Sequence, residues 1–169
     1  MAIRRGRELG ASTIEFTLIG IPMIFLLIST FEVARGMWSY ETLAYGVKEG
    51  TRYASVHGQT CATAPNTCTV TVGQVVQKVL DNSSGLLSSD MNLTLTSLSG
   101  ATACRPASSC VGNGTVWPPA PDNALGKNIE IDATYPFQSA ISMFWPGAGS
   151  GMQAAVVTFQ ASSQEAMQN

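Results

Sequence analysis

The chain has 169 residues, of which 45% are hydrophobic and only 12% are charged, about half the charged fraction of an average soluble domain. This length suits one compact domain with an appendage. The formal net charge of −2 and the scarcity of lysine argue against the basic surface of nucleic-acid-binding domains, so we expect no nucleic-acid partner.

The N-terminal part has the pattern of a basic leader followed by a membrane-spanning helix. Three arginines lie within residues 1–10, ahead of an apolar run over residues 14–31 that is interrupted only by Glu15, Pro22 and small or hydroxyl side chains. A run of this length forms about 30 Å of helix, enough to cross a bilayer core. We therefore expect residues 11–35 to span a membrane once. The positive-inside rule places the N-terminus in the cytoplasm and the rest of the chain outside.

Helical periodicity continues past the apolar run through residues 36–57, where His57 and then Gly58 end the pattern. Apolar and small side chains form a narrow seam at alternating steps of four and three residues. The seam consists of Val33, Met37, Tyr40, Ala44, Val47, Thr51 and Ala54. We predict that the last three seam residues pack on a C-terminal sheet, because the sheet follows the far end of the helix. The first three are then left for partners.

Residues 58–169 predict a small domain with a second helix and several strands. Residues 70–85 carry valines at helical spacing, and residues 91–98 and 128–137 alternate apolar and polar side chains as half-buried strands do. Residues 151–162 are the last strand candidate.

The remaining segments of this domain are expected to be irregular: a Gly/Pro/Ser-rich loop over residues 99–128 and a polar tail over residues 163–169. The predicted fold is α+β, with a long N-terminal helix packed on a small antiparallel sheet and one further helix.

The four cysteines occur as two pairs, each bracketing a short loop: Cys61 with Cys68, and Cys104 with Cys110. Four cysteines allow three connectivities. Two local disulfides suit the oxidising compartment outside the membrane. A zinc site is the competing interpretation, but it usually needs closer spacing within each pair. We predict the two local disulfides and no metal site.

No set of catalytic residues is evident. His57 is the only histidine, and it lies at the predicted end of the long helix, where a solvated or capping role is the ordinary one. The sequence contains no glycine-rich phosphate loop and no HExxH motif. Glu130 and Asp132 share the face of a strand that is expected to meet water. We therefore expect no enzymatic activity, no cofactor and no small-molecule substrate.

Glu15 is the unusual residue of the apolar run and permits two interpretations. A charged side chain at the bilayer centre costs roughly 2.5–3.5 kcal/mol on insertion scales. Glu15 lies close to the cytoplasmic interface, where the cost is smaller, so it could be a tolerated interfacial acid. Alternatively, it awaits a cation inside the membrane.

The start of the chain resembles a known processing site. A basic leader, Gly10, and then Glu15 and Phe16 opening a hydrophobic helix are similar to the cleavage site of type IV prepilins of the Flp class, which usually have Glu-Tyr at the acidic-aromatic pair. The longer stretch up to Gly58 resembles the TadE-like family of minor pilins (pseudopilins) from tight-adherence pilus systems. The matching positions are Gly10, Glu15, Phe16, Pro22, Phe31, Arg35, Gly50, Arg52 and Tyr53.

The resemblance implies that a prepilin peptidase cuts between Gly10 and Ala11. Glu15 would then pair with the freed N-terminal amine of a neighbouring subunit, so that Glu15 and Phe16 serve assembly within the membrane. The implied function is initiation, capping or anchoring of a Flp-type pilus, with other pilin subunits and the assembly machinery as partners. The implied location is the inner membrane with the domain in the periplasm, or the pilus or cell surface.

Two other interpretations stay open. The chain could be an uncleaved, single-pass membrane-anchored binding module whose helix is only a tether. It could also be a secreted protein whose apolar run is a removable signal peptide, although Ala34-Arg35-Gly36 is a poor match to a signal-peptidase site.

Overall fold

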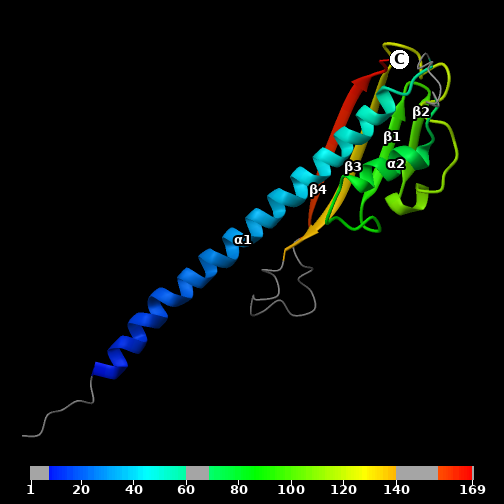
Figure 1. The fold of residues 1–169 in the computed structure, drawn as a ribbon. Helices are drawn as coiled ribbons and strands as arrows, with labels where there is room; N and C mark the ends of the chain where they lie inside the picture. The colour runs from blue at the N-terminus through cyan, green and yellow to red at the C-terminus, as the bar shows by residue number, and fades with distance from the viewer. Residues whose placement is uncertain (1–7, 60–68, 140–155, 169) are drawn as a thin grey trace, which may run out of the picture.

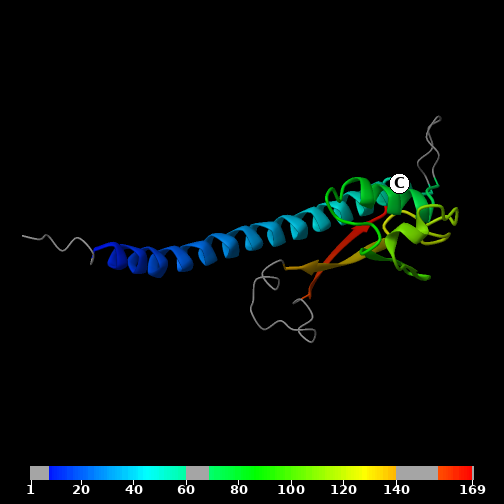
Figure 2. The same cartoon turned by 90° about the horizontal axis from the view of Figure 1, so that it is seen from below.

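The computed structural model describes residues 8–59, 69–139 and 156–168. In chain order the elements are α1 (Glu8–Ser55), α2 (Val72–Asp81), β1 (Asn92–Ser97), β2 (Gly100–Cys104), the 3-10 helix η1 (Ala107–Cys110), β3 (Asn128–Gln138) and β4 (Val156–Ala166). The described strands form one antiparallel sheet in the order β2-β1-β3-β4. The outer half of α1 and α2 lie on the same face of this sheet (Figures 1 and 2). The predicted α+β fold is confirmed.

The first half of α1 extends away from the domain (Figure 1). The helix is continuous over 48 residues, with Pro22 inside it, which corresponds to about 72 Å. Its most apolar 18-residue window has a mean hydropathy of 2.0, and none of that window is buried. Among the residues that the structure describes, α1 is the one helix long and apolar enough to cross a membrane. This N-terminal helix suggests a single-pass membrane anchor.

The second half of α1 divides the seam as predicted. Val47, Thr51 and Ala54 are fully buried, and the Thr51 hydroxyl lies 3.4 Å from the carbonyl oxygen of Ser163 on β4. By contrast, the side chains nearer the apolar run are exposed: Val33 62%, Met37 63% and Tyr40 44%. The prediction that the far end of the seam packs on the sheet is confirmed, whereas at the near end Tyr40 also contacts the ring of Phe159 on β4.

Two glycines allow α2 to cross closely over α1. A Cβ atom on Gly46 would lie 2.9 Å from the carbonyl oxygen of Val79 and 2.0 Å from the Ser83 hydroxyl. A Cβ atom on Gly50 would lie 2.3 Å from a methyl group of Val79. Because these contacts leave no space for a side chain, the packing of the two helices depends on glycine at both positions.

The start of α2 is fixed by a capping box. The Thr71 hydroxyl accepts from the backbone N–H of Gln74 at 3.3 Å, and the Gln74 side chain accepts from the backbone N–H of Thr71 at 2.9 Å. Downstream of this cap, four valines of one face are buried, as the sequence pattern predicted: Val72, Val75, Val76 and Val79.

Two expectations about the sheet are wrong. The segment 99–128, expected to be a loop, contains β2 and η1; the small side chains of β2 give no apolar alternation, and the strand forms because it pairs with β1. The polar tail expected over residues 163–169 instead continues β4 to Ala166, in register with Asn128 of β3. Beyond it, Met167 is almost fully buried. Pairing with β3 therefore extends this strand beyond the part that an apolar pattern marks.

Asp122 joins two loops of the domain. Its carboxylate is buried and accepts a hydrogen bond of 2.6 Å from the backbone N–H of Ser99, in the turn between β1 and β2. Burial acts to raise the pKa of this carboxyl, but hydrogen bonds from Ser99 and Ser97 and the charge of Lys127 outweigh it and hold the pKa below its ordinary value. Asp122 therefore acts as a charged structural acceptor.

We predict that Gly46→Val lowers the free energy of unfolding by about 1–3 kcal/mol, the usual cost of overpacking a core. The measurement is chemical unfolding of the full chain in detergent, followed by circular dichroism. Gly112→Val is the matched control, because no atom lies within 4 Å of a Cβ built on Gly112. Equal stability of the two variants would contradict the role assigned to Gly46.

Candidate functional site

In the apolar half of α1, two threonine hydroxyls bond to the helix backbone, whereas the Glu15 carboxylate has no partner among the described residues. Thr17 donates to the carbonyl oxygens of Thr13 and Ile14, and Thr30 donates to the carbonyl oxygen of Leu26. Glu15 is exposed and makes no hydrogen bond or ion pair with any residue that the structure describes. An acid in this position can bind a cation supplied by another molecule.

Phe16 and the proposed cleavage site lie in the same first turns of α1. Phe16 is 76% exposed, and its ring approaches the position that a Cβ on Gly20 would occupy, at 3.8 Å. Gly10 and Ala11 fall within α1, which begins at Glu8, so five helical positions, about 7.5 Å of rise, separate Gly10 from Glu15. Cleavage between Gly10 and Ala11 stays a prediction.

A cluster around Arg35 joins α1 to the near end of the sheet. The guanidinium forms an ion pair with Glu32 at 3.2 Å, donates to the carbonyl oxygen of Gln138, and lies 4.7 Å from the ring centre of Phe137. The Ser139 hydroxyl donates to the same Glu32 carboxylate at 3.0 Å. Arg35 follows Glu15 by about 30 Å of helix rise, so the domain attaches where the apolar segment ends.

Beside this cluster, α1 and the near ends of β3 and β4 enclose an apolar groove of about 630 Å³. The rings of Phe137 and Phe159 form its floor, with centroids 5.2 Å apart, and the Tyr40 ring meets Phe159 edge-on at 6.0 Å. Gly36 is buried beneath both phenylalanines. The walls are the exposed side chains of Val33 and Met37 on α1 and Val157 on β4. We call this feature the junction groove.

The sequence predicted only the α1 side of the junction groove. The first three seam residues were predicted to be free for partners, and they line it. Phe137 and Phe159 were missed as site residues, because nothing in the local pattern of either strand indicates that both meet Gly36. The pairing of Phe137 with Val157 in the β3–β4 register brings that side of the groove together.

The opposite face of the sheet is polar and carries a shallow hollow of about 510 Å³. Its lining residues are Asn92, Thr94, Arg105, Asp132, Thr134 and Gln160. Glu130 and Asp132 are half-exposed, in line with the wet face expected for this strand.

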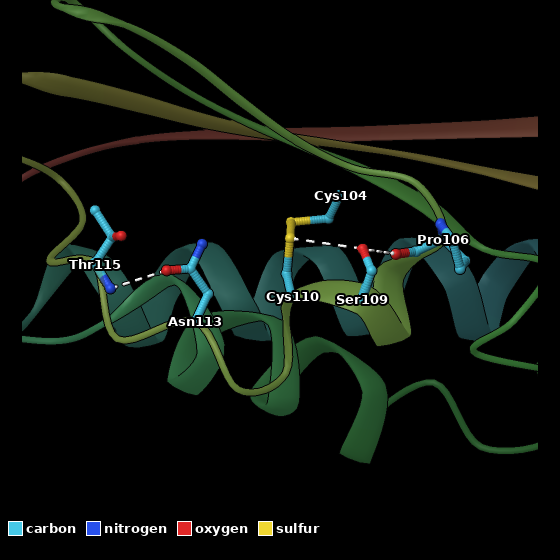
Figure 3. The surroundings of a disulfide bond; sticks show 6 residues. All are labelled: Cys104, Pro106, Ser109, Cys110, Asn113 and Thr115. Atoms are coloured by element: carbon cyan, nitrogen blue, oxygen red, sulfur yellow. Dashed lines mark hydrogen bonds between the residues drawn. A yellow bond between two sulfur atoms is a disulfide. The ribbon is translucent and has the colours of Figure 1, made fainter.

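Cys104 and Cys110 form a disulfide with Cα atoms 5.7 Å apart, which ties the end of β2 to η1 (Figure 3). Both cysteines are buried. The Ser109 hydroxyl beside them donates to the carbonyl oxygen of Pro106 at 2.7 Å. The other predicted disulfide, between Cys61 and Cys68, lies outside the described residues.

His57 takes a structural position at the end of α1. Its Nδ1 lies 2.7 Å from the carbonyl oxygen of Tyr53, and the two rings lie against each other with centroids 4.5 Å apart. No group of three or more His, Cys, Asp or Glu side chains suitable for a metal ion occurs within the described ranges.

Comparison with known protein families gives a match to the N-terminal helix. Residues 10–52 match the family model of TadE-like proteins, so the resemblance seen in the sequence is confirmed over this segment. The segment coincides with α1 from its first turn to its last. No curated protein and no solved structure matches the chain at a significant level.

We predict that Cys104 and Cys110 are disulfide-bonded in the native protein and that replacing both by serine lowers the free energy of unfolding by about 2 kcal/mol. Peptide mapping of protein that is alkylated while unfolded and unreduced should find the two cysteines linked to each other. Alkylation of either cysteine before reduction would contradict the prediction.

Proposed function

We propose that this chain, whose residues 10–52 match the TadE-like family, is a minor pilin or pseudopilin that takes part in the assembly, initiation or anchoring of a Tad (Flp-type) pilus. The family match and the apolar helix support membrane association and a Tad pilus context. The specific role as an assembly subunit is our inference from the structure of α1.

One observation carries this proposal: the apolar half of α1 is a continuation of the domain's own core helix and is itself uncovered. From Thr13 to Phe31 the side chains are nearly all exposed, while farther along the same helix one face is buried, at Val47, Thr51 and Ala54. A simple tether would need neither rigid continuity with the core nor an acid near its start. A helix that joins a bundle of other subunits benefits from both.

Glu15 and Ala11 have complementary roles in this proposal. Cleavage after Gly10 creates a positively charged amine on Ala11, and Glu15 of a neighbouring subunit attracts it. In a layer of low dielectric constant such an ion pair is stronger than in water. Glycine suits position 10, just before the cut, because the absence of a side chain lets a peptidase approach the backbone closely.

The proposed topology places residues 1–10 in the cytoplasm, where the basic leader is retained, and the domain in the periplasm. The disulfide between Cys104 and Cys110 suits that oxidising compartment. The partners are other pilin or pseudopilin subunits, the pilus assembly machinery and a prepilin peptidase. The proposal includes no enzymatic activity.

A second candidate function is an uncleaved, membrane-anchored binding module. The polar hollow on the outer face of the sheet favours it, because Arg105, Asp132 and Gln160 could bind a polar ligand there. In that case α1 would be only a tether, and neutralising Glu15 would not affect any assembly.

We predict that Glu15→Gln leaves membrane insertion unchanged but lowers co-purification with other pilin subunits by at least about tenfold, which corresponds to about 1.4 kcal/mol. The amide keeps the size of the side chain and removes its charge. Co-purification is measured by quantitative mass spectrometry after mild detergent extraction from cells that carry the pilus system.

Glu8→Gln is the matched control, because it removes a carboxylate from the same helix but on the leader side of the proposed cut. It should leave the assembled fraction at the wild-type level. Equal co-purification of wild type, Glu15→Gln and Glu8→Gln would contradict the assembly role and favour the binding module.

A further inference from the structure

The junction groove continues a stripe along one face of α1 that begins in the apolar half of the helix. Leu26, Ser29, Val33, Gly36 and Tyr40 follow one another at steps of three and four residues, and the last four line the groove. The stripe extends for about 21 Å along the helix. A single partner molecule can therefore contact the stripe both inside the bilayer and just outside it.

The outer part of the groove lies beyond the apolar run of α1. Tyr40 follows Phe31, the last residue of the apolar run, by nine residues, which corresponds to about 13 Å of helix rise. With the membrane-spanning segment predicted over residues 11–35, Tyr40 lies about 7 Å of helix rise beyond the acyl chains, at the level of the head groups. An apolar surface of this kind at the level of the head groups marks an interaction site.

A protein segment that covers the stripe both within the bilayer and in the water outside it has to be a helix. Within the bilayer every backbone N–H and C=O group must be satisfied inside the spanning element, which leaves helices and closed barrels. Ser29 and Gly36 are small residues on the stripe, and small residues allow a second helix backbone to approach closely.

The two sides of α1 differ at this height, which gives the partner one place to dock. Opposite the junction groove, the smaller hollow that contains Arg35, Ser39 and Thr42 has a mixed polar lining and is bordered by the loop after α2. The junction groove is almost entirely apolar, apart from Glu32, Glu41 and two serines.

The charge of Glu41 favours a different subunit over a second copy of this chain as the partner in the groove. Glu32 is already paired with Arg35, but Glu41 is exposed and forms no ion pair with any described residue. A second copy anchored at the same depth would present Glu41 again, and its nearest cations along the helix are Arg35 and Lys48, about 9 and 10 Å away in height. Two copies at the same depth would therefore place two Glu41 carboxylates at one height with no cation of α1 beside them.

We propose that the junction groove binds the membrane-spanning helix of a different membrane-anchored subunit, one that carries a Lys or Arg opposite Glu41. This inference rests on the proposed function and names the class of partner: an apolar helix with a basic residue just outside the bilayer. The cation pairs with Glu41, while apolar side chains of that helix cover Phe137 and Phe159.

The test is site-specific photocrosslinking of the full chain in membranes of cells that express the complete pilus system. A benzophenone amino acid replaces Met37 in the groove or, as the control, Tyr45, which is exposed on the part of α1 outside the groove. Mass spectrometry identifies the peptide joined to each position. We expect Met37 to crosslink to the apolar helix of another membrane subunit with a basic residue next to it, and Tyr45 to give no such product.

Other products at Met37 would overturn the proposal: a second copy of the chain, lipid alone, residues 140–155 of the same chain, or no product. These outcomes leave the proposed function intact if Glu15→Gln still reduces co-purification of pilin subunits. If Glu15→Gln has no effect, the proposed function fails whatever the groove binds.

A matched pair of variants tests the groove independently. Val156 and Val157 are neighbours on β4 with nearly equal exposure, 48% and 51%, but only Val157 lines the groove, because successive strand residues face opposite sides. Val157→Lys should abolish the Met37 crosslink, whereas Val156→Lys should preserve it. Glu41→Gln should lower its yield by up to about fivefold, the range of an exposed ion pair, with Glu130→Gln as the control. Equal yields in all four variants would overturn the proposal.

Discussion

The burial of one face of α1 against the sheet and α2 is the interaction on which the rest of the structure depends. Leu43, Val47 and Ala54 are fully buried there, and glycine at positions 46 and 50 lets α2 cross close to the helix axis. Since α1 continues without a break into its apolar half, holding the outer half in the domain fixes the direction in which the membrane half projects (Figure 1). The cluster around Arg35 is a second attachment, at the level where the apolar segment ends.

In the proposed function, this arrangement lets a small domain set how its own helix enters a membrane bundle. In the membrane half, lipid competes with other helices for the same apolar surface, so hydrophobicity alone does not drive association. Specific features must do so, and the structure offers one at each end of the segment: the Glu15 carboxylate, which has no partner among the described residues, and an aromatic groove beyond Phe31. A rigid helix between them makes the two contacts geometrically dependent on each other.

Much of this organisation could be predicted from the sequence, because it depends on local periodicity. The long helix, the division of its seam and the valine face of α2 all follow from apolar residues at helical spacing. What the sequence did not reveal depends on distant pairing. β2 has only small side chains and forms through β1, and the polar end of β4 is ordered by its register with β3. The floor of the junction groove was missed for the same reason, since Phe137 and Phe159 meet Gly36 only after the sheet has formed.

The central claim is that the chain is a processed pilus subunit and not a tethered binding module, and the intact mass of the protein in its native membrane tests it most directly. With an active prepilin peptidase present, the account predicts a mature chain that begins at Ala11 and lacks the mass of residues 1–10. In Gly10→Val the same measurement should give the uncut chain, still in the membrane. An intact leader in the wild-type protein beside an active peptidase would contradict the account, and Glu15 would then be an interfacial acid with no role in assembly.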